Sequence, residues 1–282
     1  SYRTAVIGLI LGGIFMTGWL VLTGIPFWIS LLFLFGALLL FLGLTRIVAE
    51  GGVPTLTAPT ISSSAVVSGI GSSNVGASGL VGLGFTYVYS SDVRTFPMSP
   101  AAHGLKMAEE MGKRKRLLFL GMLLALIIGI FASLWLVLRL SYTYGGANLN
   151  SWYFVGGPKA PFLYTADKIL HPTGPNGLGW LCKGIGAAVM FGLMFMRNRF
   201  LWWPLHPIGF TVGSLTWISQ LWFSIFLAWL LKSLILRYGG PKLYKNTVPF
   251  FLGLILGQYT CAGIWVVIDY FTKMEGNMVF WI

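Results

Sequence analysis

The chain of 282 residues is 56% hydrophobic and only 9% charged, whereas a soluble domain carries about 25% charged residues. A soluble fold of this size could not cover so many apolar side chains, which excludes a soluble globular enzyme and indicates a helical membrane protein. The formal net charge of +12 does not indicate nucleic-acid binding. The basic residues stand at the ends of apolar runs, where they favour the cytoplasmic face and anionic lipid headgroups.

Five apolar runs are long enough, at about 20 residues each, to cross the hydrocarbon core as helices. They lie at 5–22, 26–48, 117–138, 178–196 and 248–268, and a tight turn at 23–25 joins the first two. We therefore expect an all-α integral membrane protein, a polytopic helical bundle that forms a single transmembrane domain over residues 1–282.

The first irregular stretch, residues 51–91, is apolar on average but rich in Gly, Ser, Thr and Pro. Broken helices at membrane depth occur only where they are buried in protein or line a cavity. Arg46 precedes this stretch, and a basic segment at 92–116, expected in the cytoplasm, follows it. To keep both on one side, residues 51–91 must enter and return, either as a re-entrant hairpin or as two short crossings.

The second irregular stretch, residues 200–231, is also bracketed by basic residues. It is too short for two full crossings, so it is either one crossing or a re-entrant hairpin. We favour the hairpin because it keeps the flanking basic residues on one side. Residues 141–177 are expected to form an extracytoplasmic loop with a short surface helix at 161–170, and Ser99-Pro100 predicts a short helix over 101–112.

No enzyme motif is present in the sequence. The three histidines, His103, His171 and His206, lack the spacing of a helical metal site, and there is no Walker loop or cysteine cluster. We therefore expect no catalytic residue, no metal, no cofactor and no enzymatic activity.

A polar, glycine-rich track follows the second span and enters the first irregular stretch. Unwound backbone and half-helix termini can bind a solute without moving a full charge into lipid. Small residues also allow close helix packing, which explains individual serines, but we interpret the track as a whole as a solute path. Its candidate residues are Glu50, Gly51, Gly52, Thr55, Thr57, Thr60, Ser62, Ser64, Ser72, Ser73 and Asn74.

Glu50 is the candidate proton-coupling residue, because an acid beside a helix break in a membrane segment indicates a functional site. The alternative is an interfacial acid that pairs with Arg46 one helical turn earlier. His206, between two prolines, is a candidate for handling a proton or solute, or else a helix-break residue at the interface.

Several segments resemble a family of bacterial multi-spanning membrane proteins, the DUF6784/DUF6785 type. The similar segments are AEGG at 49–52, PLHPIGF at 204–210, WLLK at 229–232, LRYGG at 236–240 and PFFLGLILG at 249–257. These proteins distantly resemble the oligopeptide transporter superfamily. The resemblance implies that the chain is the C-terminal half of a longer protein with two similar halves. It also implies secondary, often proton-coupled uptake of peptides or metal chelates.

Our leading hypothesis is a secondary active transporter, or half of one, in the cell inner (cytoplasmic) membrane. The expected partners are the lipid bilayer, a small-molecule solute, the N-terminal half of the same chain and a second copy in a homo-oligomer, with no nucleic acid. One alternative is a non-transporting scaffold subunit. Another is an intramembrane enzyme that acts on lipid-linked substrates through Glu50, His171 and His206.

Overall fold

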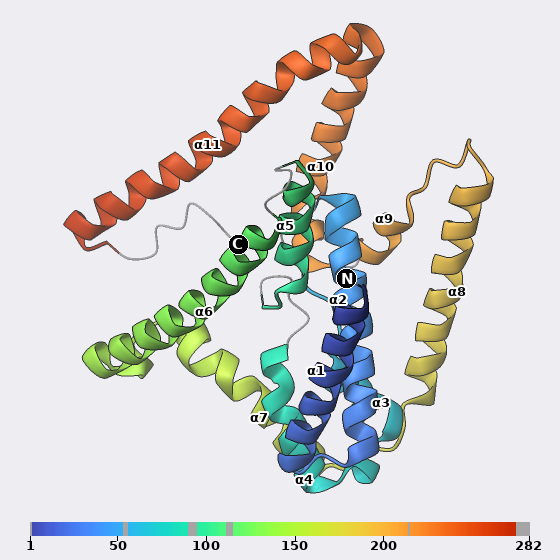
Figure 1. Ribbon diagram of the computed structural model, residues 1–282, viewed down its shortest axis with the longest axis vertical. Helices are drawn as coiled ribbons and strands as arrows, with labels where there is room; N and C mark the ends of the chain where they lie inside the picture. The colour runs from blue at the N-terminus through green and yellow to red at the C-terminus, as the bar shows by residue number, and fades with distance from the viewer. Residues whose placement is uncertain (1, 53–55, 90–94, 111–114, 214, 275–282) are drawn as a thin grey trace. The chain divides into compact units, whose positions relative to one another are not determined.

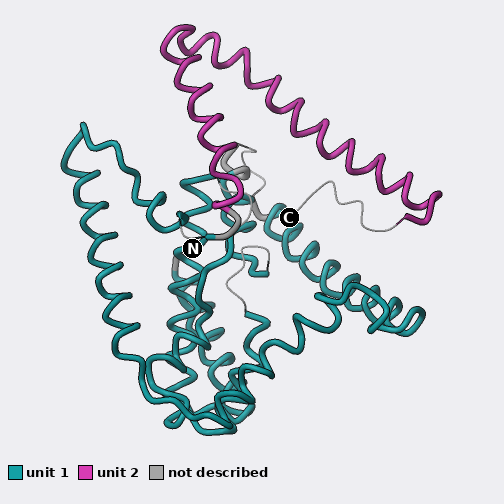
Figure 2. The backbone as a smooth tube through the Cα atoms, turned by 180° about the vertical axis from the view of Figure 1, so that it is seen from behind, with its two compact units in different colours: residues 1–215 teal, residues 216–282 magenta. Residues whose placement is uncertain are grey.

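The computed structural model describes residues 2–52, 56–89, 95–110, 115–213 and 215–274 (Figure 1). Within these residues the regular elements are all helical, which confirms the predicted all-α fold. The chain divides into two compact units, residues 1–215 and residues 216–282 (Figure 2).

The helices follow one another along the chain with short connections. Unit 1 contains α1 (Tyr2–Leu22), α2 (Phe27–Gly51), α3 (Ser62–Ile70), α4 (Ser72–Phe85), η1 (Thr86–Tyr89), α5 (Met98–Glu110), α6 (Lys115–Leu140), η3 (Ser141–Gly145), η4 (Gly146–Asn148), η5 (Trp152–Gly156), α7 (Gly157–Leu170), α8 (Gly177–Arg199) and α9 (Pro207–Val212). Unit 2 contains α10 (Thr216–Leu234), η6 (Ile235–Gly239) and α11 (Gly240–Thr272).

Five helical segments are long and apolar enough to cross a membrane: Arg3–Leu22, Phe27–Gly51, Leu117–Asn148, Gly177–Arg199 and Ile218–Thr272. Each overlaps one of the five predicted spans. Large apolar side chains in the middle of these helices, such as Phe131 and Phe191, are exposed on the chain itself. Lipid is the solvent that suits such surfaces, so the chain is a multi-pass membrane protein.

The core of unit 1 forms where the α1–α2 hairpin meets α3 and α4. The α1–α2 turn places Ile25 against α4, and one stripe of α2 (Ile29, Phe33 and its neighbours) is buried. The buried apolar cluster consists of Leu20, Ile25, Ile29, Phe33, Val66, Val67, Val75, Leu80 and Leu83. In a lipid environment, close van der Waals packing of these side chains stabilises the contact between the helices.

The first irregular stretch runs along α2 and returns. Ser62 at the start of α3 donates a hydrogen bond to the carbonyl oxygen of Phe33 on α2, at 2.6 Å. After the turn at Gly71, α4 packs against the α1–α2 turn, and Phe96 then stacks on Phe41 of α2 with ring centroids 4.4 Å apart. The stretch therefore reaches the far end of α2 and comes back, which favours two short crossings over a shallow re-entrant hairpin.

The predicted surface helix in 141–177 is present as α7, but it begins four residues earlier than expected, at Gly157. Pro158 lies in its first turn, where a missing N–H costs nothing. α7 packs closely against α4: Phe162 meets Phe85 edge-on at 5.3 Å, and the Thr165 side chain is buried. The predicted helix at 101–112 is present as α5, which packs against α2.

The second irregular stretch contains the expected break. α9 is six residues long, and Gly213 follows it before α10 begins in the next compact unit. At about 1.5 Å per residue, the 19 residues of α10 extend about 28 Å, close to the thickness of the hydrocarbon core. α10 alone is thus long enough for a crossing, which favours a single crossing over the re-entrant hairpin that we expected.

Candidate functional site

A cavity of about 630 Å³ lies between the C-terminal halves of α2 and α8 and reaches the start of α9. We call it the α2–α8 cavity. Leu39, Leu42, Gly43, Arg46, Ile47, Glu50, Met190, Met194, Arg197, Asn198, His206, Pro207, Ile208 and Thr211 line it. Its volume falls within the range of about 300–1,000 Å³ that is common for small-molecule sites.

On α2, the cavity-lining residues form one stripe of the helix. Leu39, Gly43, Arg46 and Glu50 recur at intervals of three and four residues, so they share a face. The buried stripe around Phe33 packs into the core, which leaves the cavity stripe uncovered. The sequence thus places apolar residues deep along this face and charged residues at the helix end.

The last turns of α8 repeat this arrangement. Met190, Met194 and Arg197 are spaced by four and three residues, with the arginine in the last turn. We call the end of α2 and α8 that carries Arg46 and Arg197 the basic end. There the cavity has charged groups, whereas methionine and leucine form its apolar walls.

His206 joins the cavity through the start of α9. Its Nδ1 accepts a hydrogen bond from the backbone N–H of Ile208 at 3.1 Å and thereby caps the helix. Pro207, at the first helical position, fixes the backbone there. Because Nδ1 is an acceptor, the neutral ring carries its proton on Nε2, which is a donor.

Glu50 lies in the cavity but not in the buried setting that we expected for a proton carrier. The Nε of Arg46 donates to Glu50 Oε1 at 2.7 Å, and the two side chains are 59% and 44% exposed. Arg197 and His206 also lie within electrostatic range of the Glu50 carboxylate. The alternative contact with Arg46 is thus present, and it occurs inside the same cavity as His206.

The rest of the predicted polar track is not part of this cavity. Ser62 is bonded to α2, Ser64 donates to the carbonyl oxygen of Ile61, and the Asn74 amide donates to that of Ile70. Ser73 is exposed. These hydrogen bonds agree with the alternative interpretation, in which the individual polar residues serve helix packing.

Five further track residues precede α3 in the chain. Gly51 and Gly52 end α2, where Gly52 has the left-handed φ of +63° that a helix C-cap favours. Thr57 and Thr60 are half-buried in the segment before α3. Thr55 lies outside the described residues.

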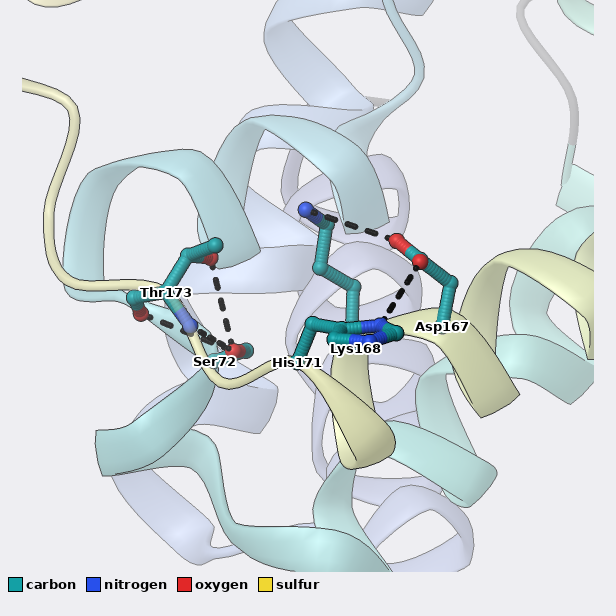
Figure 3. Close-up of polar contacts among 5 residues, drawn as sticks. All are labelled: Ser72, Asp167, Lys168, His171 and Thr173. Atoms are coloured by element: carbon teal, nitrogen blue, oxygen red, sulfur yellow. Dashed lines mark hydrogen bonds and ion pairs between the residues drawn. The ribbon is translucent and has the colours of Figure 1, made fainter.

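Ser72 lies at the turn between α3 and α4, near the end of α2 that is opposite to Glu50. We call this turn the tip. Its Oγ accepts a hydrogen bond from the backbone N–H of Thr173 at 2.8 Å (Figure 3). The backbone N–H of Asn176 donates to the carbonyl oxygen of Ser68 at 2.9 Å, and Gly69 faces the ring of Trp180. The tip is therefore joined to the loop before α8 and to the first turn of α8.

His171 also lies at the tip, where its Nδ1 is 3.3 Å from Asp167 Oδ1, and Lys168 approaches the same carboxylate (Figure 3). Glu50 and His206 are at the basic end, separated from the tip by the length of α2. The three groups of the hypothetical enzyme site are thus not brought together. Within the described residues, no three His, Cys, Asp or Glu side chains cluster in a way that could bind a metal ion.

Ser62 and Ser63 are adjacent and both buried, but their hydroxyls differ. The Ser62 hydroxyl has its bond to Phe33, whereas the Ser63 hydroxyl has no hydrogen-bond partner among the described residues. Ser63 borders a small void that Tyr87, Tyr164 and other residues line.

Replacing Ser62 by alanine should lower the free energy of unfolding by about 1 kcal/mol, the usual net value of one hydrogen bond. The same change at Ser63 removes a buried hydroxyl that gains no bond, so stability should stay the same or rise by up to about 1 kcal/mol. Unfolding of the purified protein in mixed micelles, followed by circular dichroism, measures both. An equal loss for the two variants would contradict this assignment and would indicate that Ser63 has a bound partner.

Sequence reasoning missed half of the cavity. Arg197, Asn198, Met190 and Met194 were not candidates, although the polar and methionine positions near the end of α8 share one helical face. That periodicity was a usable signal, but nothing in the sequence indicated that this face lies opposite α2, some 150 residues earlier.

Comparison with known proteins gives one family. Its model matches residues 1–281 and is described as a family of unknown function, DUF6785. No curated protein and no solved structure matches the chain.

Proposed function

The chain belongs to this family, DUF6785, and we propose that it is a secondary transporter, or half of one, for a small solute. The membrane in which it acts is the cytoplasmic membrane, with the basic end on the cytoplasmic side, as the distribution of Arg and Lys favours. It is not an enzyme in this proposal.

The observation that carries the proposal is the unequal separation of α2 and α8 along their length. At the tip, α4 packs against the α1–α2 turn, and the turn between α3 and α4 is joined to the loop before α8 through Ser72–Thr173 and Ser68–Asn176. At the basic end, a cavity of about 630 Å³ lies between residues of α2 and α8. In alternating access, a transporter is closed at one membrane face and open at the other. Contacts at the tip together with a cavity at the basic end are what we expect of one such state.

Broken helices beside the cavity support this function. α2 ends at Gly51, residues 56–61 contain no helix before α3 begins at Ser62, and α9 is a single short helix. Such segments can change conformation at lower cost than continuous helices, because few helical hydrogen bonds must be broken. The distant resemblance to the oligopeptide transporter superfamily suggests a peptide or a metal chelate as solute. Independently of it, Glu50 beside the end of α2 is our candidate for coupling the movement of the solute to a proton.

The scaffold and enzyme alternatives both predict no solute flux, so a transport assay distinguishes them from the proposed function. The purified full-length protein is placed in liposomes that contain a pH-sensitive dye, with an acidic exterior. Dipeptides, tripeptides and ferric citrate are then added as probes. Transport predicts acidification of the interior with at least one probe, and no change in liposomes without protein. Absence of flux with every probe, with and without the pH gradient, would refute the proposal.

Filling the cavity should inhibit transport without unfolding the protein. A side chain at Gly43 would meet no atom within 4 Å, so Gly43→Phe can occupy the cavity from its wall. We expect initial uptake to fall about fivefold or more, with unchanged thermal stability, because phenylalanine is more favourable than glycine in a helix. Gly12→Phe on α1 is the matched control, since Gly12 also has open space around it and does not line the cavity. Equal inhibition by both variants would mean that the loss of transport does not come from filling this cavity.

A further inference from the structure

We propose that the α2–α8 cavity binds an anionic group, a carboxylate or a phosphate, at Arg197 and His206. This inference names the ligand class of the proposed transporter and rests on that function only for the movement of the ligand. Binding itself can be tested at equilibrium without any transport.

The first argument is the charge of the cavity. Arg46 and Arg197 carry positive charges in its lining and Glu50 carries a negative one, so two positive charges face one negative charge. Arg46 is already engaged with Glu50 through the 2.7 Å hydrogen bond. Arg197, in contrast, forms no ion pair with any acidic side chain of the described residues. Arg197 lies within electrostatic range of Glu50 but does not form the direct contact that Arg46 forms, so its guanidinium donors remain available to a ligand.

The second argument is the set of donors. The guanidinium of Arg197 can donate two parallel hydrogen bonds to a carboxylate or phosphate, a geometry that a lysine cannot offer. His206 presents its Nε2–H, because its Nδ1 is occupied by the backbone of Ile208. The Asn198 amide is a further donor in the lining. These donors come from α8 and from the start of α9.

The third argument is the apolar wall beside these donors. Leu39, Leu42, Met190 and Met194 lie deeper along the same two helices. Such a wall accommodates the uncharged part of a ligand. An anion with a short apolar body therefore matches both regions of the cavity.

Such an anion could be a free solute or the headgroup of a lipid, since both can reach the end of membrane helices. Their shared chemistry is the anionic oxygen group. The protein is therefore placed in nanodiscs made of zwitterionic phosphatidylcholine, and binding of succinate and of inorganic phosphate is measured by calorimetry.

Arg197→Gln should weaken binding of these probes about tenfold or more, because it removes a charge-assisted hydrogen-bond donor. Arg199→Gln is the matched control: Arg199 lies in the same last turn of α8 but does not line the cavity. Its effect should stay within about twofold, as expected for a surface charge. Succinamide, the uncharged analogue, should bind at least tenfold more weakly than succinate.

A second variant changes the affinity in the opposite direction. Glu50→Gln removes the negative charge from the cavity and releases Arg46, so the affinity for succinate should rise severalfold. Equal weakening by Arg197→Gln and Arg199→Gln, or equal binding of succinate and succinamide, would overturn the proposal.

Nanodiscs that contain phosphatidylglycerol identify the source of the anion. If the lipid headgroup competes with succinate, and Arg197→Gln relieves the competition, the anion site stands and a lipid can occupy it. If succinate binds equally in both lipids, the site stands and serves a free solute. Neither result depends on flux, so a failed transport assay would refute the proposed function and leave anion binding intact.

Discussion

Replacing Gly71 by alanine is expected to destabilise unit 1 by about 3 kcal/mol or more, as two costs of about 1–3 kcal/mol each combine. Gly71 has φ +91° and ψ 141°, a backbone conformation that side chains with a Cβ rarely adopt. A Cβ there would also lie 2.9 Å from the backbone atoms of Thr173, Gly174 and Pro175. The tip could not then remain joined to the loop before α8, and we expect solute flux to be lost as well.

Gly76→Ala distinguishes the cost of backbone strain from the cost of steric overlap with the loop. Gly76, at the kink within α4, also has a positive φ, of +75°, but a Cβ there would meet nothing within 4 Å. It should therefore show only the backbone strain, about 1–3 kcal/mol. Unfolding curves in mixed micelles measure both variants. A loss at Gly71 no larger than that at Gly76 would mean that the loop at 173–175 does not pack on the tip.

The membrane helices could be predicted from the sequence because their signal is local. Apolar runs such as 117–138 need no knowledge of neighbours, since any helix that spans lipid must be apolar over about 20 residues. The break at 51–61 was also predictable, because Gly51, Gly52 and two prolines interrupt the apolar run. The family resemblance identified from short motifs was confirmed over residues 1–281.

The arrangement of the breaks was not predictable, because it depends on contacts between distant residues. Ser72 was a candidate for a solute path, yet its partner is the backbone of Thr173, about 100 residues later. Charge counting favoured a hairpin at 200–231, but the length of α10 favours one crossing. The distribution of basic residues favours one topology over another, but it does not determine how long each helix is.

Two of the predicted candidate residues line the same cavity. Glu50 and His206 were both predicted, and the cavity brings them together, although they are about 150 residues apart. Their relation to Arg197 depends on the parallel course of α2 and α8, which the tip contacts establish. The structure thus replaces a linear track of hydroxyls by two features: a joined tip and a charged cavity at the opposite end.

Glu50→Gln is expected to abolish proton-coupled flux while it strengthens anion binding. The neutral amide resembles a protonated carboxyl group, so Arg46 is released to the ligand, but glutamine cannot carry or return the proton. Proton binding at Glu50 and anion binding at Arg46 and Arg197 would then favour each other, since coupling between two ligands is reciprocal. Dye-reported proton entry in liposomes should fall to the level without protein. Succinate affinity in nanodiscs should rise severalfold, because one negative charge has left the cavity.

The double variant Arg46→Gln/Glu50→Gln distinguishes a proton carrier from a partner in an ion pair. Both side chains are about half exposed, so their removal should leave the protein folded. If Glu50 served only to neutralise Arg46, removing both charges would restore the net charge of the cavity, and flux would recover. If Glu50 carries the proton, flux stays at background although anion affinity returns toward its original value. Recovery of flux in the double variant would therefore reject Glu50 as the coupling residue and leave the Arg197 site as the functional centre of the cavity.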